Sequence, residues 1–394
     1  MAGITALGTT YNLPNYTGIL HQLTPSDTPF FSAIGGLSGG GQTNANEFEW
    51  QTFDLRAAAQ STALEGADAP TDSERVRASV NNIVQIHHET VGVSYTKLAA
   101  TQVKAGINNA QSNPVTNELD WQVEQMLKQM VRDVEYSFIQ GSYQKPADNT
   151  TARKTRGILA AISTNTEDAS ALAGNGASTT TAATNVVAET AHGLVNGDRV
   201  RVEVLTGSAG LTDGASYYVI AASANDFKLS LTVGGAEVDI TSDGTVDVWK
   251  YDDLVEADVL DLLQSVWENG GIQESETATL IGNAYQKRRL SKIFITDKNY
   301  QEGSRNVGGV RVMTIETDFG TLNVMLDRHM PTDQLAVVSL EQCMPVYQEI
   351  PGKGHFFAEP LARTGAKDRT QLYGEVGLAY GNERSHGKIT GLKS

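Results

Sequence analysis

The longest run of regularly spaced apolar residues lies between Asn117 and Gly141. These residues recur at intervals of three or four positions, which places them on one face of an α-helix. Asn117 or Thr116 can cap the start, acidic residues occupy the first turn, and Gly141 suits the end. We predict one helix over residues 117–141, about 37 Å long, that supports other elements. Its predicted core positions are Leu119, Val123, Met126, Leu127, Met130, Val134 and Phe138.

Two segments nearer the N-terminus alternate between apolar and polar residues, which is typical of β-strands. They cover residues 47–55 and 82–96, and the alternation slips at Gln51 and Thr52, which predicts a bulge there. The intervening residues 56–81 are rich in Ala, Ser, Thr and acids, and a loop of this length is usually functional or disordered. We predict an extended two-stranded hairpin. Because an isolated hairpin is only marginally stable in water, it should need a partner surface.

Residues 1–45 form a predicted arm. Their apolar stretch, residues 17–34, is interrupted by Pro25 and Pro29 and is followed by a glycine-rich segment. Such a segment has little core of its own. We expect it to lie across the body of the chain or across a neighbouring copy.

The composition changes over residues 165–250, where Thr, Ala, Gly, Val and Asp dominate and residues 169–183 are of low complexity. This segment holds 4 basic and 11 acidic residues, a net charge of about -7. Short strand candidates separated by glycine-containing turns predict a small inserted β-barrel or β-sandwich. The candidate strands are residues 185–188, 199–205, 216–222, 228–233, 238–241 and 246–250.

Helices and strands alternate in the rest of the chain without a repeated βαβ rhythm, so we predict an α+β fold. The predicted helices are residues 252–269 and 283–293. Residues 310–315 and 322–326 should form a hairpin. Further predicted strands are residues 277–281, 335–340 and 371–380.

Charge and composition narrow the classes of function. The chain has 394 residues, with 30 basic and 46 acidic side chains and a formal charge of -16, which disfavours tight nucleic-acid binding. Its single cysteine, Cys343, excludes an intrachain disulfide and a cysteine-based zinc site, and should be a buried apolar residue. Residues 1–12 lack a secretory signal pattern, and no apolar run is long enough to cross a bilayer. We expect a protein made in a cytoplasm.

Several motifs resemble catalytic or ligand sites, but each lacks its required context. Gly36-Leu37-Ser38-Gly39-Gly40 matches G-x-S-x-G without the strand and helix that present the serine of a hydrolase, so a flexible hinge is favoured. The glycines at 352–354 and 174–176 lack the spacing of a phosphate-binding loop and are interpreted as turns.

The histidines and one basic cluster are further candidates for ligand binding. His87 and His88 are adjacent on a strand and therefore point to opposite faces. The other histidines are scattered, and a histidine-only metal site remains a minor alternative. The basic cluster at residues 287–292 should pair with a neighbouring acidic surface, with phosphate binding as the alternative. We therefore predict no catalytic residues, no metal site, no cofactor and no enzymatic activity.

The ordered set of elements resembles the major capsid proteins of tailed bacteriophages with the Hong Kong 97-type fold. Three segments carry the resemblance in detail: Thr24 to Phe30; Asp318 to Leu322 followed by Asp327 to Pro331; and Gly374 through His386-Gly387. The likeness covers the chain outside residues 165–250. It implies an N-terminal arm at 1–45, an E-loop hairpin at 46–96, a peripheral domain at 97–164 with its spine helix, the insert at 165–250, an axial domain at 251–309, and remaining strands at 310–394.

The resemblance also implies a function. Copies would join into hexamers and pentamers that form an icosahedral shell around double-stranded DNA in the virion, without sequence-specific DNA binding and after assembly in the host cytoplasm. Implied partners are other copies of the chain, a portal protein, a separate scaffolding protein and a possible decoration protein. The insert would project outward. The expected contacts between subunits are Phe30, Phe31, Arg56, Glu65, Asp72, Arg75 and Arg77.

Two further points qualify this expectation. Some members of the family cross-link the subunits of the shell covalently through an E-loop lysine. This chain has no lysine before Lys97, so we predict a non-covalent shell. The competing class is a different assembly subunit, such as a tail-tube or surface-layer protein.

Overall fold

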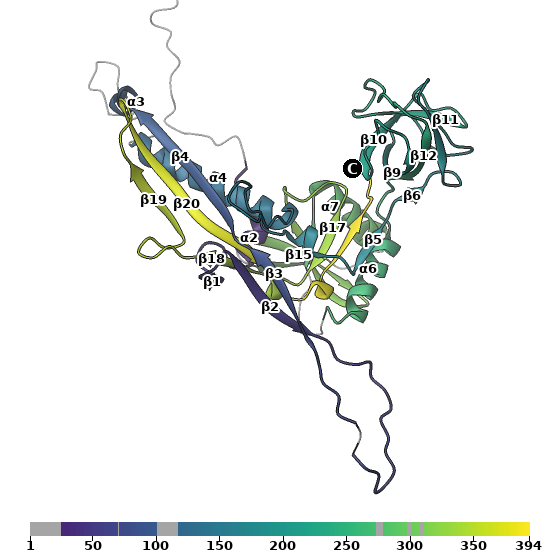
Figure 1. The fold of residues 1–394 in the computed structure, drawn as a ribbon, viewed down its shortest axis with the longest axis horizontal. Coiled ribbons are helices and arrows are strands. Elements are labelled where there is room, and N and C mark those ends of the chain that lie inside the picture. Colours follow the sequence, from purple (N-terminus) through teal and green to yellow (C-terminus); the bar gives the residue numbers. More distant parts are fainter. Residues whose placement is uncertain (1–24, 70, 101–116, 273–278, 298–301, 308–309) are drawn as a thin grey trace, which may run out of the picture.

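The computed structural model describes residues 25–69, 71–100, 117–272, 279–297, 302–307 and 310–394. Figure 1 shows a central body of sheets and helices, a long hairpin that extends away from it, and a separate β-barrel on another side of the body. Helices and sheets pack together without a repeated βαβ unit, which confirms the α+β fold class.

Helix α4 (Glu118–Gln140) runs along the body as the predicted spine. Asn117 caps it by accepting a hydrogen bond from Leu119 N at 3.1 Å, and it ends at Gly141. A Cβ at Gly141 would lie only 2.2 Å from the Ser137 carbonyl oxygen, so the close approach of the backbone requires glycine.

The predicted core stripe of α4 is buried along its C-terminal half. Met130, Val134 and Phe138 are fully buried, as predicted. The N-terminal part of the stripe is only half-buried in the described chain and comprises Leu119, Val123, Met126 and Leu127. The spacing of apolar residues did not indicate that Glu135, a charged residue on the same helix, is also buried.

A five-stranded sheet packs against α4. Its longest strand, β20 (Lys367–Ala379), pairs with β4 (Gln85–Ser94) along one edge and with β19 (Phe356–Leu361) along the other. Strand β18 (Met344–Gln348) pairs with the C-terminal end of β20 and carries the short parallel strand β1 (Gly41–Thr43).

The hairpin differs from its prediction. It consists of β2 (Glu47–Phe53) and β3 (Arg77–Ile83), joined by residues 54–76. Their register runs without a shift, so the predicted bulge at Gln51 and Thr52 is wrong. Most of the second predicted strand is instead β4, which leaves the hairpin and joins β20.

The split between β3 and β4 has a visible physical cause. Ile83 and Val84 are consecutive and both buried, which breaks the alternation of a strand with one buried face. The chain therefore changes direction at this point, and the hairpin separates from the body.

A second sheet of seven strands forms the other part of the body. Its order is β14-β15-β16-β13-β17-β21-β5. The strands are β14 (Glu302–Val307), β15 (Val310–Thr317), β16 (Gly320–Leu326), β13 (Thr279–Gly282), β17 (Leu335–Val338), β21 (Gly387–Thr390) and β5 (Thr166–Asp168). Strand β5 thus belongs to this sheet, although the sequence placed it in the insert.

Two helices accompany this second sheet. Helix α6 (Glu256–Glu268) starts later than predicted, where the Asp258 carboxylate accepts the Val255 backbone N–H at 3.0 Å. Helix α7 (Ala284–Leu290) continues as a π-helix over Ser291–Asp297. Apolar side chains of α6, including Leu262 and Leu263, form a core with the sheet.

The insert is a closed barrel rather than a sandwich. Its strands pair in the ring β12-β7-β8-β11-β10-β9, which closes because β9 also pairs with β12. The strands are β7 (Ser178–Thr181), β8 (Val186–Ala188), β9 (Arg199–Gly207), β10 (Ala215–Ile220), β11 (Asp226–Ser230) and β12 (Gly244–Lys250), with β6 (Ala171–Leu172) beside β12. The predicted strand at 238–241 is absent, and only a single bridge joins Glu237 to Ser230.

The remaining short helices complete the body. They are α2 (Pro29–Ala33), α3 (Tyr95–Ala100) and α5 (Ile158–Ala161), with 3-10 turns at Leu340–Gln342 and Glu383–Ser385.

Candidate functional site: surfaces for assembly

The hairpin exposes apolar side chains to solvent at the end of β2 and along the loop that follows it. Leu55 and Leu64 are 69% and 85% exposed, and Phe53 and Val76 are similarly open. Figure 1 shows this loop reaching far from the body. Exposed apolar side chains gathered on one extended loop are typical of a surface that binds another protein.

Charged residues accompany this apolar surface. All five predicted contact residues of the hairpin are exposed, and none forms an ion pair within the described part of the chain. They are Arg56, Glu65, Asp72, Arg75 and Arg77. Their contact with a neighbouring copy stays a prediction.

The root of the hairpin is fixed to the body by aromatic and charged contacts. The Trp50 ring meets the Tyr380 ring edge-on at 4.9 Å, and Trp50 Nε1 donates to the Gly381 carbonyl at 2.6 Å. Lys145 Nζ lies 2.5 Å from Glu47 Oε2. The hydrogen bond from Lys145 holds the pKa of Glu47 below its ordinary value. The hairpin is therefore presented from a rigid base.

Asn82 joins the hairpin, the sheet and the segment after α4. Its Nδ2 donates to the carbonyl oxygens of Leu378 and Arg156 at 2.7 and 3.1 Å, and its Oδ1 accepts from Arg156 N at 2.9 Å. The side chain is fully buried. Sequence reasoning missed this residue because its partners lie far away along the chain.

The arm is anchored to the body by residues 27–34, which we call the arm anchor. Phe30 and Phe31 are 0% and 1% exposed and pack in the core with Val134 and Phe138. This burial leaves no exposed side-chain surface for a neighbour. The prediction that these two residues form contacts between subunits is therefore corrected.

Two charged residues of the body, Glu135 and Arg328, hold the arm anchor. The Glu135 carboxyl accepts the backbone N–H groups of Phe30 and Phe31 at 2.8 and 2.6 Å. On the exposed side, Arg328 Nε lies 3.0 Å from Asp27 Oδ1. The arm therefore leaves the body from a defined position on α4.

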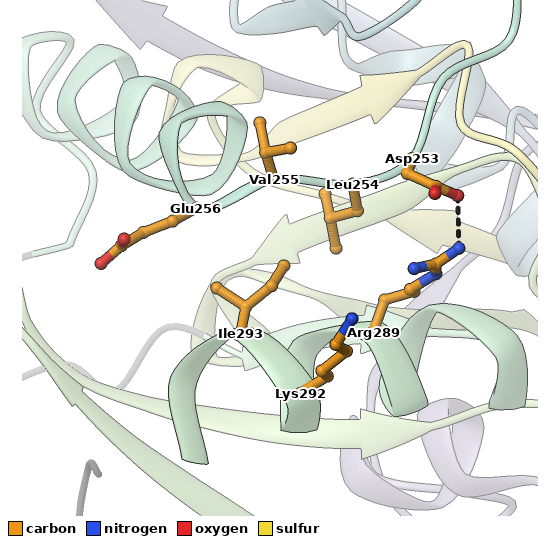
Figure 2. A pocket seen from close by; sticks show the side chains of 7 residues that line it. All are labelled: Asp253, Leu254, Val255, Glu256, Arg289, Lys292 and Ile293. Atoms are coloured by element: carbon orange, nitrogen blue, oxygen red, sulfur yellow. Dashed lines mark hydrogen bonds and ion pairs between the residues drawn. The ribbon is translucent and has the colours of Figure 1, made fainter. Parts of the chain in front are cut away.

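A groove of about 350 Å³ lies between the start of α6 and helix α7 with its π-helical continuation (Figure 2). Apolar and charged side chains line it together: Asp253, Leu254, Val255, Glu256, Arg289, Lys292 and Ile293. Arg289 Nη2 lies 2.5 Å from Asp253 Oδ1. Part of the basic cluster at 287–292 thus pairs within its own chain, while Arg288 and Lys292 are exposed.

The histidines do not assemble a metal site in the described ranges. No group of three or more His, Cys, Asp or Glu side chains suited to a metal ion occurs there. His87 is buried and His88 exposed, in line with their opposite faces on β4, and burial lowers the pKa of His87 to about 4.

His386 serves a structural purpose. Its Nδ1 accepts the Ser339 backbone N–H at 3.1 Å, and its Nε2 lies 2.7 Å from the Tyr380 carbonyl oxygen. A neutral ring with the proton on Nε2 satisfies both contacts. Cys343 is buried, as predicted.

Among the helices that the structure describes, none has the length and apolar character needed to span a lipid bilayer.

The fold defines a class of protein. The solved capsid asymmetric unit of cyanophage A-1(L) is similar at a TM-score of 0.54 and 11% identity, with 98% of this chain and 99% of that chain covered. The SrpI encapsulin complex of Synechococcus elongatus PCC 7942 is similar at a TM-score of 0.50 and 10% identity, with 96% and 93% covered. A protein of Mycobacterium phage Bobi is similar at 0.50 and 9%, with 97% and 96% covered. These likenesses show the Hong Kong 97-type fold of shell-forming proteins.

Comparison of the sequence with family models shows the family of this chain. A family model described as the SU10 major capsid protein matches residues 3–393, and the chain belongs to this family. No curated protein matches the sequence. The chain is thus a major capsid protein that forms the shell of a tailed bacteriophage, and its family is structural rather than enzymatic.

Proposed function

We propose that copies of this chain join into hexamers and pentamers that close an icosahedral shell around double-stranded DNA. The observation that carries this proposal is the hairpin, whose loop leaves Leu55, Leu64 and Val76 exposed in the described part of the chain. In each capsomer the hairpin lies over the adjacent copy, which covers these side chains. The net charge of -16 suits a container that does not hold its DNA tightly.

The positions of α6, α7 and the arm in the capsomer are proposed relative to this contact. The region of α6 and α7 lies at the capsomer centre, and the arm continues from its anchor toward neighbouring copies. Exposed Arg288 and Lys292 face the acidic surface of the next copy around the ring. Support for these placements comes from the family fold and from the charges on the two helices.

The inserted barrel projects outward from the shell. Support comes from its attachment, since the chain enters it after β5 and leaves it before α6, and Arg199 Nη2 forms an ion pair with Asp333 at 2.9 Å. A domain tied to the body at one place can project without altering the body. Deletion of residues 169–250 should leave shells that lack density at the outer surface. Density lost at the inner surface would refute this placement.

Scaffolding, portal and decoration proteins are proposed partners, and assembly takes place in the cytoplasm of the bacterial host. Purified full-length chain, imaged by electron microscopy with and without a scaffolding protein, tests the assembly. We expect closed shells, with more complete closure when the scaffold is present. Tubes, flat sheets or persistent monomers under both conditions would contradict the proposed function.

A further inference from the structure

The groove between α6 and α7 offers an apolar surface with a positive charge beside it. Leu254, Val255 and Ile293 supply the apolar side chains, and Val255 is 50% exposed. Figure 2 shows the side chains of Lys292 and Ile293 pointing toward the segment that precedes α6. Lys292 is itself exposed. A ligand for this groove therefore combines an apolar group with a negative charge.

The far end of α6 carries a group of that kind. Trp267 is 56% exposed and is the one tryptophan among the exposed apolar side chains of the described residues. With 3.6 residues per turn, Asp261 and Glu268 lie within about a third of a turn of Trp267, and both are exposed. A large exposed apolar side chain rimmed by charged residues is typical of a surface that binds another protein. Tryptophan is also among the residues that most often dominate the affinity of such surfaces.

Trp267 cannot occupy the groove of its own chain. Glu256, which lines the groove, is the first residue of α6, and Trp267 follows it by eleven positions on the same helix. The two residues are therefore about 16 Å apart along the helix axis. A contact between Trp267 and a groove requires a second copy of the chain.

The two surfaces fit each other in size and charge. A volume of about 350 Å³ lies at the lower end of the about 300–1,000 Å³ of pockets that enclose small ligands, and it has room for an indole ring. A lysine ammonium group is attracted to the face of an aromatic ring, and most strongly to tryptophan. Helix α6 contains four acidic residues and no basic one, and α7 contains three basic residues and no acidic one. Glu268 beside the ring therefore meets the basic side of the groove.

We propose that Trp267 of each copy inserts into the groove between α6 and α7 of the next copy around the capsomer. This contact rests on the proposed function and names the partner of the α6–α7 region. Because the two surfaces differ, a pair of copies leaves one groove and one Trp267 available for further copies. Repetition of such a head-to-tail contact generates a ring when the rotation closes. Hexamers and pentamers are rings of this type.

Substitution of Trp267 in the full-length chain tests the insertion. Trp267→Ala should raise the protein concentration needed for shell formation at least about tenfold, since it removes the central anchor of the contact. Trp267→Phe keeps an aromatic ring and should assemble at a concentration closer to that of the wild type. Light scattering follows assembly, and circular dichroism verifies that each variant is folded. Assembly of Trp267→Ala at the wild-type concentration would overturn the proposal.

Reversal of two charges tests which surfaces meet. Glu268→Lys and Lys292→Glu should each impair shell formation, because each places like charges opposite one another between copies. Both side chains are exposed, and a lysine near the C-terminal end of α6 suits the helix dipole, so the subunit should fold normally. The double variant should recover most of the lost assembly. Normal assembly of both single variants, or impaired singles without recovery in the double variant, would contradict the contact.

The wild type is measured in the same series. Closed wild-type shells together with unimpaired assembly of Trp267→Ala would refute this contact alone and leave the proposed function standing. A wild type that never closes shells would contradict the proposed function and this contact together.

Discussion

At the scale of single residues, polar side chains buried in the body connect segments that are distant in the sequence. His386 is the clearest case, because one neutral ring joins the ends of β17 and β20 to the start of β21. Its replacement leaves a backbone N–H and a carbonyl oxygen buried without partners, and each unsatisfied group costs about 1–3 kcal/mol.

We predict that His386→Phe lowers the free energy of unfolding by about 2–6 kcal/mol. Denaturant titration of the subunit measures this change. His88→Phe is the matched control and should change stability by less than about 0.5 kcal/mol, since His88 is exposed on β4. Equal effects of the two substitutions would contradict the assigned contacts.

Because His386 is buried in its neutral form, the stability of the subunit should depend on pH. Burial lowers the pKa of folded His386 from 6.5, so the unfolded chain binds more protons below that pH. The stability contributed by the neutral ring is present above pH 6.5 and is lost as pH falls further. His386→Phe should therefore lose less stability than the wild type between pH 7 and 5.

The spine helix gives a second prediction at this scale. Met130→Asp places an unpaired charge at a fully buried position and should cost at least about 4 kcal/mol, enough to prevent folding. Glu124→Gln on the exposed face should fold normally. Recovery of soluble, cooperatively unfolding Met130→Asp protein would show that the buried face has been misassigned.

Apolar core positions could be predicted from the sequence, whereas buried polar and charged residues could not. The apolar positions Val134 and Phe138 follow from helical spacing alone. Glu135 occupies the same helix but carries a charge, and its burial is accompanied by hydrogen bonds from the backbone of Phe30 and Phe31, which are 105 and 104 positions away. Local patterns contain no information on such partners.

At the scale of elements, the long periodic helix was predictable, and so were short strands with a clear apolar pattern such as β8 and β17, whereas other short strands were not. The bounds of α4 agree with the sequence within one residue, because its caps and its apolar stripe indicate the same limits. Strands β5, β18 and β21 are short, and their pairing depends on distant segments, so their own sequences give a weak signal. The hairpin was predicted as a feature, but its second strand was misplaced because β3 has few apolar residues, whereas the alternating apolar residues that follow it belong to β4.

The hairpin supplies the prediction at this scale. Leu55→Asp combined with Leu64→Asp should leave the stability of the subunit within about 0.5 kcal/mol of the wild type, because both side chains are exposed. Shell formation should be lost, because charges would be buried at the contact with the neighbouring copy. Light scattering follows assembly.

The matched control replaces the same two leucines by methionine, which keeps the surface apolar and should retain shells. Normal assembly of the aspartate variant would show that the hairpin tip does not carry the contact.

At the scale of the whole molecule, the chain combines a body that builds the shell with a barrel that has its own core. The barrel core includes Val187, Val219 and Phe227 and is separate from the two cores of the body. The sequence indicated this division through its change in composition. It could not indicate that β5 belongs to the body, since Thr166–Asp168 lies at the border and pairs with β21 near the C-terminus.

The chemistry of the whole shell can also be predicted. The first 96 residues contain no lysine, so no lysine of the hairpin can form an isopeptide bond to a neighbour. Boiled particles on a denaturing gel should run as a single band near 42.2 kDa. A ladder of multimers would show a covalent shell.

The central claim is that the hairpin of one copy lies on the adjacent copy within a closed shell. A cryo-electron microscopy reconstruction of assembled particles tests it most directly. We predict continuous density for residues 54–76 over the neighbouring subunit, with Leu55 and Leu64 covered by that subunit. A closed shell in which these residues lie against their own body, or extend into solvent without touching a neighbour, would contradict the account.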